Sequence, residues 1–448
     1  MRTTLAVAFP LGVIGMLLPL LAGCGADEQS GSQPFKAGVA SVKIAPEKPG
    51  LYLAGYGMNR SSTKVHDDIY ARALAMQQGD TTVVWVSLDL LGLLEPDVSE
   101  IRAAVKDVPP THIVICCTHV HSAPDVIGFW GPKEGVSGVN EEYRKFVKER
   151  TVEAINEAVK GLKSARVKLA TVTAPPKTAT NIRDPKSIDP QISIAQIVDP
   201  AGDPIAVVVN WACHPEILNN TNLEVTSDYV GYLREVVEKK LGGTCLFFNG
   251  ALGGMVTGDV SEHSFKEAER VGSAVGDAVV KALTPGEAAL RPDLSFATQA
   301  VKIPIENQKY LAAMKAGLLP AYAGAAATEV SADLAVMWLG PSVWMTMPGE
   351  PLPSVGLAAK ALAASDHKFL VGLGNGELGY ILDKDAWGQN TYDYEMSMSM
   401  GPKTAGLCLD GLKMLLAAAP DWTKPAKPSV AENQKSGTAK ISDASALK

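Results

Sequence analysis

The sequence contains few cysteines, few histidines and no excess of basic side chains, and each shortage narrows the possible functions. Six cysteines and seven histidines occur among 448 residues, and the net charge is -7. Because an acidic chain without a basic stretch offers no surface for nucleic acid, we expect no nucleic-acid partner. No Cys-x-x-Cys spacing indicates a structural zinc site, and no Gly-x-x-x-x-Gly-Lys pattern indicates a phosphate-binding loop.

The first residues of the chain predict export and membrane attachment. A short apolar stretch ends in Leu21-Ala22-Gly23, which is typical of a signal peptide over residues 1–23. Cys24 follows directly, and this arrangement resembles the lipobox of bacterial lipoproteins, in which the cysteine is lipidated. We expect an exported lipoprotein of a bacterium, held on the periplasmic or cell-surface side of a membrane by a lipid on Cys24 and a flexible tether over residues 24–34. The alternative is an ordinary signal peptide that leaves Cys24 as a free thiol.

Five cysteines remain after Cys24, an odd number that forbids complete pairing into disulfides. Four of them lie in apolar, strand-like surroundings, which favours buried small residues over a disulfide framework. The five are Cys116, Cys117, Cys213, Cys245 and Cys408.

Alternation of apolar runs with amphipathic stretches predicts one large α/β domain over residues 35–420, with a mixed β-sheet core and flanking helices. Thr82–Leu88 and Ile205–Trp211 are almost wholly apolar, which predicts strands buried on both faces. Helical spacing of apolar residues predicts a helix at Tyr229–Leu241. Residues 421–448 are rich in Lys, Ala, Ser and Pro, and we expect them to form a disordered tail.

Two histidines one residue apart, His119 and His121, follow the apolar run Ile113–Ile115. In an extended segment residues i and i+2 point the same way, so both imidazoles are predicted to face one pocket. Because imidazole is the commonest protein ligand of zinc, two on one face indicate half of a metal site. The alternative is a pair of histidines hydrogen-bonded to nearby backbone at a strand end.

Two further candidates follow apolar strands, where α/β folds place their chemistry. His214 follows Ile205–Trp211 directly, and Glu350 ends the segment Met347-Pro348-Gly349-Glu350. His214 is a third ligand candidate, and its alternative is a purely structural role.

These motifs, in this order, resemble the catalytic domain of the neutral/alkaline (non-lysosomal) ceramidases over roughly residues 36–415. Four segments carry the resemblance: Thr118-His119-Val120-His121-Ser122-Ala123-Pro124, Asn210-Trp211-Ala212-Cys213-His214-Pro215, Met347-Pro348-Gly349-Glu350 and Leu378-Gly379-Tyr380. That family binds one zinc through two histidines, a glutamate and a tyrosine. The resemblance therefore implies one Zn²⁺ per chain, with ligands His119, His214, Glu350 and Tyr380. Only the resemblance supports Tyr380, whose alternative role is packing.

The resemblance also implies three catalytic side chains, His121, Tyr392 and Arg183, which would stabilise the oxyanion or protonate the leaving amine. Tyr392 has the family's spacing of twelve from Tyr380, although Tyr394 competes for its role, and Arg183 has a surface ion pair as its alternative. The implied activity is zinc-dependent hydrolysis of an N-acyl amide, such as a ceramide-like lipid, by zinc-activated water.

Two departures from the family bear on this activity. Gly254 lies where the family has a serine, which excludes a covalent serine mechanism at this position. We also expect the chain to lack the family's C-terminal immunoglobulin-like domain. A zinc hydrolase of another amide or ester and a non-catalytic zinc-containing lipoprotein therefore stay as alternatives. A zinc-β-lactamase-like enzyme is disfavoured, because Ser122 follows His121 and no histidine follows Asp125.

Overall fold

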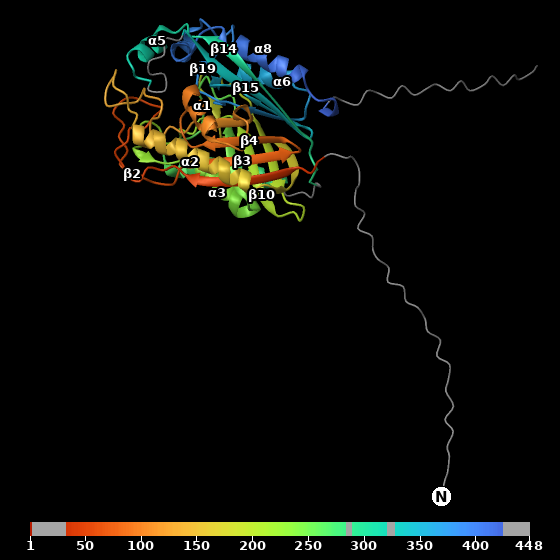
Figure 1. Cartoon of the computed structure of the whole chain (residues 1–448). Helices are drawn as coiled ribbons and strands as arrows, with labels where there is room; N and C mark the ends of the chain where they lie inside the picture. The colour runs from red at the N-terminus through yellow and green to blue at the C-terminus, as the bar shows by residue number, and fades with distance from the viewer. Residues whose placement is uncertain (2–32, 284–288, 320–327, 424–448) are drawn as a thin grey trace, which may run out of the picture. The chain divides into compact units, whose positions relative to one another are not determined.

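The apolar runs form three β-sheets in the computed structural model, which describes Met1 and residues 33–283, 289–319 and 328–423 (Figure 1). All elements below belong to the unit that begins at Gln33. The predicted signal peptide, Cys24, most of the predicted tether and most of the predicted tail lie outside the described residues and stay predictions.

The first sheet has the strand order β5-β4-β3-β1-β6. Helices α1 (Glu95–Ala104) and α2 (Glu141–Lys160) pack together, and α2 lies along β1 and β3 (Figure 1). The strands are β1 (Lys36–Lys43), β3 (Tyr70–Gln78), β4 (Thr81–Leu88), β5 (Ile113–Cys117) and β6 (Lys163–Ser164).

The second and third sheets have the orders β12-β10-β9-β7 and β14-β15-β16-β18. Their strands are β7 (Arg166–Thr173), β9 (Gln191–Val198), β10 (Pro204–Trp211), β12 (Thr244–Asn249), β14 (Leu294–Pro304), β15 (Glu329–Leu339), β16 (Ser342–Thr346) and β18 (His367–Val371). Short paired strands are β2 (Lys64–Val65) with β11 (Glu224–Val225), β8 (Thr180–Asn181) with β13 (Val256–Thr257), and β17 (Glu350–Pro351) with β19 (Tyr380–Ile381).

Helices cover the outer faces of these two sheets. Helices α3 (Tyr229–Leu241) and α4 (Phe265–Leu283) pack on the second sheet, and α6 (Pro353–Leu362) and α8 (Thr404–Ala417) pack on the third (Figure 1). The remaining helices are α5 (Gln308–Lys315) and α7 (Asp393–Ser397). The predicted mixed sheet core with flanking helices is confirmed.

The inner faces of the three sheets share one apolar core. Each sheet contributes a large aromatic side chain to it, since the Trp85 ring lies edge-on to both Phe248 and Trp344 at centroid distances of 5.8 and 5.3 Å. Alternation along a strand explains why these runs are apolar throughout: Val208 of β10 faces this core, whereas Val207 and Val209 face α3 and α4.

One pair of neighbouring strands in each of these sheets is parallel: β4–β5, β10–β12 and β16–β18. Their carboxyl ends meet, because the Gly372 amide after β18 donates to the Asn249 carbonyl at the end of β12 (3.0 Å), and the Asn249 amide side chain donates to the Thr118 carbonyl after β5 (2.9 Å). The loops that follow the parallel strands of all three sheets therefore start close to one another.

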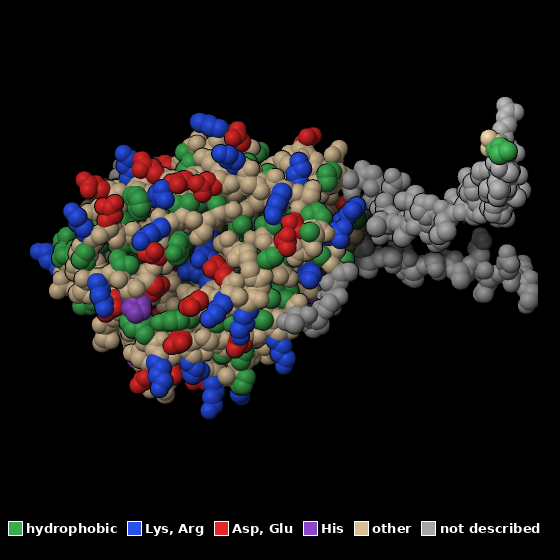
Figure 2. Space-filling view, turned by 90° about the horizontal axis from the view of Figure 1, so that it is seen from below, with side chains coloured by type: hydrophobic (Ala, Val, Ile, Leu, Met, Phe, Trp, Pro, Cys, Tyr) green, Lys and Arg blue, Asp and Glu red, His purple; other side chains and the backbone are tan. Residues whose placement is uncertain are grey.

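The five cysteines after Cys24 are buried and unpaired, as predicted. Acidic and basic side chains are interspersed over the face shown in Figure 2, without a field of one sign. Within the described residues, no helix combines the length and the apolar character that a membrane span requires.

A buried ion pair joins α3 to the end of β4, and its loss should destabilise the fold. The Arg234 guanidinium donates to both Asp89 oxygens at 2.9 and 2.8 Å, with side chains 3% and 0% exposed. Arg234→Ala leaves the Asp89 carboxylate buried without this partner, so we expect unfolding free energy to fall by about 3–5 kcal/mol in urea denaturation. Lys240→Ala is the matched control on α3, because its pair with Asp277 is 49% and 58% exposed and should contribute less than about 1 kcal/mol. Equal losses would contradict this account.

Candidate functional site

The loops after β5, β10 and β16 bring His119, His214 and Glu350 together in the interior. The Nε2 atoms of His119 and His214 lie 3.4 and 3.2 Å from the same Glu350 oxygen, Oε2. The other ring nitrogen of each histidine meets a backbone carbonyl: His119 Nδ1 lies 2.8 Å from Leu91 O, and His214 Nδ1 lies 2.9 Å from Val256 O. Carbonyl partners on Nδ1 orient both Nε2 atoms toward the carboxylate, as in histidines that bind metals.

Burial and mutual charge set the protonation of this cluster. Burial by itself would raise the pKa of Glu350, but His119 and His214 outweigh it and lower that pKa to about 2. Burial would lower the pKa of His214, but Glu216 and Glu350 outweigh it and raise that pKa to about 9. Without a cation, the cluster therefore holds a proton on His214 next to a charged Glu350.

His121 lies beside the other two histidines, with its ring centroid 4.9 Å from that of His119 and 5.6 Å from that of His214. Both its ring nitrogens are buried and make no hydrogen bond within the described residues, although Glu216 Oε2 lies 3.5 Å from Nδ1. Burial, followed by the two neighbouring histidines, holds the pKa of His121 well below its usual value. His121 is therefore a neutral imidazole with free hydrogen-bonding capacity.

The backbone conformation at these histidines differs from the predicted one. Strand β5 ends at Cys117, and His119 has a left-handed φ of 69°, so the extended alternation predicted for His119 and His121 is wrong. The two rings still share one site, because the His119 amide donates to the Leu90 carbonyl (2.9 Å) and the His121 amide donates to the Pro215 carbonyl (3.1 Å). Strain of this kind persists only where surrounding contacts enforce it, and it is typical of functional sites.

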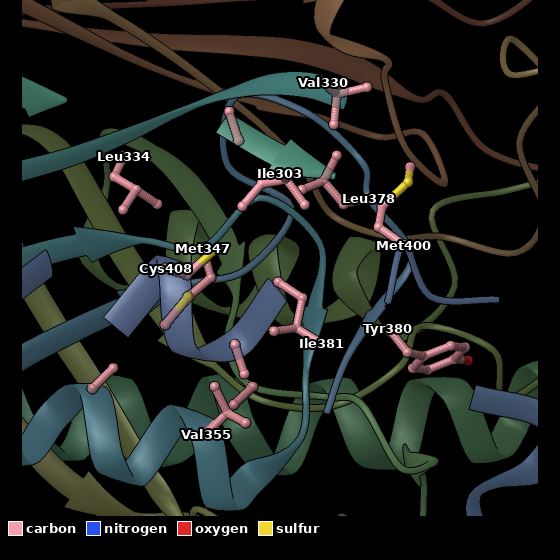
Figure 3. Close-up of a cluster of buried hydrophobic side chains, with 14 of the residues drawn as sticks. Ile303, Val330, Leu334, Met347, Val355, Leu378, Tyr380, Ile381, Met400 and Cys408 are labelled. Carbon is pink, nitrogen blue, oxygen red and sulfur yellow. The ribbon is translucent and has the colours of Figure 1, made fainter. Parts of the chain in front are cut away.

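Tyr380 reaches the site through a short parallel strand pair. Strand β17 begins at Glu350 and β19 begins at Tyr380, and these two residues are register partners. In Figure 3 the Tyr380 ring lies at the edge of the apolar cluster and projects away from the Ile381 side chain. Alternation along β19 thus buries Ile381 in the core and directs Tyr380 to the cavity described below.

Gly253 and Gly254 shape the loop behind Glu350. A Cβ on Gly253 would lie 2.5 Å from the Glu350 carbonyl oxygen, so only glycine lets this loop pack against β17. Gly254 has a φ of +69°, and a Cβ there would lie 3.1 Å from Leu352 Cδ2 and 3.5 Å from Tyr392 Cε1. Gly254 therefore fits a tight left-handed turn.

The other predicted catalytic residues lie further out. The Arg183 Nε donates to Glu395 Oε1 at 2.8 Å, and because the Glu395 side chain is 0% exposed this is not the surface ion pair named as the alternative. Tyr394 lines the cavity with Tyr380, whereas the Tyr392 ring lies next to Gly254. Neither Arg183 nor Tyr392 is among the described residues that line the cavity, and their catalytic roles stay predictions.

The cavity beside the cluster holds about 50 Å³, far less than a drug-sized ligand needs. Its walls combine the polar cluster with apolar and aromatic side chains, so it suits a small polar group attached to an apolar one. It is lined by Gly55, Leu91, Leu94, His119, His121, Ile127, Phe129, Trp130, Tyr310, Glu350, Glu377, Gly379, Tyr380, Tyr394 and Met398.

Sequence reasoning missed two carboxylates at this site. Glu377 lines the cavity, and Glu216 accepts a hydrogen bond from the Tyr56 hydroxyl at 2.9 Å while facing His121. Burial, followed by the charge of Glu350, raises the pKa of Glu377 well above its usual value. Glu377 lies three residues before Tyr380 and Glu216 two after His214, so proximity to the predicted ligands was the available signal.

The donors present fit a metal ion. His119, His121 and His214 each offer a ring nitrogen, and these atoms lie within 4.8 Å of one another; donor atoms of His119, Glu350 and Glu377 are equally close. Imidazole nitrogens with a carboxylate oxygen are the usual protein ligands of zinc. Without a cation, the ring nitrogens of His121 also have no hydrogen-bond partner among the described residues.

Comparison with known proteins gives one consistent likeness. No protein-family model matches the sequence. The neutral ceramidase of Pseudomonas aeruginosa is 22% identical over 220 residues, which are 44% of this chain and 33% of that protein; the match spans about a third of the relative's length.

Two solved structures are also similar. The crystal structure of neutral ceramidase from Pseudomonas aeruginosa superposes with a TM-score of 0.70 and 17% identity, over 87% of this chain and 77% of that one. A ceramidase complexed with C2 gives a TM-score of 0.71 and 16% identity, over 87% and 78%. The predicted resemblance to the neutral ceramidases is thus confirmed, and the fold of this chain is the neutral ceramidase fold.

Proposed function

We propose that this chain is a metal-dependent amide hydrolase of the neutral ceramidase kind, which cleaves an N-acyl amide and uses one zinc ion per chain. One observation carries the proposal: His119 Nε2 and His214 Nε2 converge on Glu350 Oε2, and His119 and Glu350 line a largely apolar cavity. Tyr380 lines the same cavity and completes the proposed ligand set. The likeness to neutral ceramidases supports the reaction class.

The metal and the side chains around it can each be assigned a part in the proposed reaction. Zinc held there would supply Lewis acidity toward water and the amide carbonyl. His121 is neutral and has free ring nitrogens at the cavity wall, so it can donate a hydrogen bond to a developing oxyanion, or accept a proton from the attacking water and pass it to the leaving amine. Glu216 Oε2 lies 3.5 Å from His121 Nδ1 and accepts a hydrogen bond from the Tyr56 hydroxyl.

The cavity walls favour an acyl group as the ligand. Leu91, Leu94, Ile127 and Phe129 give the cavity an apolar wall, and hydrogen bonds formed in apolar surroundings are stronger than in water. A volume of about 50 Å³ admits an amide and its first carbon atoms, so a long acyl chain would have to extend beyond the walls. Hydrolysis of fluorogenic N-acyl amides and esters that differ in acyl length, with and without chelator, tests the proposal. Inertness of a zinc-loaded protein on the whole panel would favour the alternative of a zinc-containing binding protein.

Loss of a histidine ligand should remove the metal. His119→Ala and His214→Ala each delete a nitrogen donor, so we expect each variant to lose most of about one zinc per chain. The measurement is metal content after dialysis, by inductively coupled plasma mass spectrometry. His263→Ala is the matched control, because His263 is exposed and bonds the Ile217 carbonyl outside the cluster. Full occupancy in both ligand variants would show that the ligand assignment is wrong.

Metal affinity should weaken as pH falls below about 9. The pKa of His214 is raised to about 9 in the metal-free site, so binding must displace a proton from this ring at neutral pH. The apparent Kd should rise by about tenfold per pH unit for each proton released and should level off at higher pH. Competition with a chromophoric chelator across this range measures the slope. An affinity independent of pH would contradict the assignment of His214 as a ligand.

A serine hydroxyl at position 254 should not be needed for catalysis. Gly254→Ser and Gly254→Ala both place a Cβ in a left-handed turn, so each should cost about 1–2 kcal/mol of stability. Amide hydrolysis by the serine variant should not exceed that of the alanine variant, and no acyl-enzyme should accumulate in burst kinetics. Activity that appears only in the serine variant would identify the natural chain as a binding protein on an enzyme's fold.

A further inference from the structure

Glu377 presents a buried carboxyl oxygen that no protein group satisfies. Its side chain is 8% exposed, and Oε2 makes no hydrogen bond within the described residues. The other oxygen, Oε1, accepts from the Gly379 amide at 2.7 Å, which fixes the carboxyl group at the cavity wall. An unsatisfied buried oxygen is costly, so a site that retains one indicates a ligand that completes it.

The position of the Glu377 carboxyl group relative to the cluster indicates what that ligand is. One donor atom each of His119, Glu350 and Glu377 lie within 4.8 Å of one another. Two atoms bound to one ion at about 2.1 Å are at most about 4.2 Å apart, so a contraction of roughly half an ångström is enough for shared coordination. Two buried carboxyl groups this close cannot both carry a charge without a cation between them, so a metal bound here would be expected to take up Glu377 as the carboxylate, with release of its proton.

We propose that Glu377 is a fifth protein donor to the metal, beside His119, His214, Glu350 and Tyr380. The inference rests on the proposed metal site and extends it, because a second carboxylate raises the coordination number above the four of a closed tetrahedral zinc site. Oxygen-rich sites of higher coordination also accept Mn²⁺ and Co²⁺ more readily.

The local backbone leaves room for this role. A Cβ at Gly92 would lie 2.9 Å from Glu377 Cγ, so glycine there gives the glutamate its space. Glu377 follows β18 and precedes β19, and its hydrogen bond to Gly379 ties its position to that of Tyr380. Both side chains are thus set by one turn.

The test compares Glu377→Gln with a matched loss of charge, Glu216→Gln. Glutamine keeps an oxygen for the Gly379 amide but removes the anionic donor. Glu216 faces His121 and is outside the two groups of possible metal ligands among the described residues, so its variant removes a nearby negative charge without removing a proposed donor. Zinc Kd by chelator competition should weaken about 10–100-fold in Glu377→Gln and clearly less in Glu216→Gln.

Cobalt substitution reports coordination without any activity assay. The visible d–d bands of Co²⁺ intensify as coordination number falls, so they should strengthen in Glu377→Gln and stay unchanged in Glu216→Gln. Glu377→Asp, which keeps the charge but draws the oxygen back, gives the same readout if the glutamine variant does not fold.

The outcomes separate the two proposals. A wild-type chain that binds neither zinc nor cobalt would overturn the proposed function. Normal binding in the wild type, with the same affinity and cobalt spectrum in the Glu377 variants, would overturn only the role of Glu377. Equal weakening in the Glu377 and Glu216 variants with an unchanged spectrum would also overturn it, because charge alone would then explain the effect.

Discussion

Three sheets end at one place in the interior of this fold, and the buried backbone groups there need hydrogen-bond partners. Buried asparagine side chains form several of the hydrogen bonds that these backbone groups need. Asn249 accepts from the Cys213 amide and donates to the Thr118 and Cys213 carbonyls, Asn210 bonds the Leu370 amide and carbonyl, and Asn375 accepts from the Ile115 amide. Each amide side chain joins two sheets or their loops. Because unpaired buried backbone groups are costly, these bonds define where the following loops can begin.

These asparagine hydrogen bonds help to position the residues that form the candidate site. Asn249 holds the residues that precede His119 and His214, so the spacing of the two histidines depends on one side chain. The loop after β12 packs closely against the backbone of Glu350 at Gly253. A cluster of histidines and carboxylates concentrates charge in an apolar interior, and such charge is tolerated where partners or a cation compensate it. The same convergence of donor atoms in an apolar interior makes this site suited to a metal.

Much of the secondary structure could be predicted from local pattern. The apolar spacing of Tyr229–Leu241 predicted α3 with its observed bounds, and Ile205–Trp211 predicted all but the first residue of β10. Prediction failed at His119, where an extended backbone was expected and a left-handed residue occurs. That conformation is imposed by contacts with Leu90 and Leu91, which are distant in sequence, so no local pattern indicates it.

The sequence by itself determined the strand and helix periods, the buried cysteines and, through four ordered motifs, the resemblance that named His119, His214, Glu350 and Tyr380. Its first residues also predict export and lipid attachment. Only the tertiary structure decided that Glu377 lines the cavity and Glu216 faces His121, that Arg183 pairs with Glu395, and that Tyr394 rather than Tyr392 lines the wall. The physical reason is that periodicity reports which face of a segment is buried, whereas a site depends on which buried faces meet, and that is set by packing between distant segments.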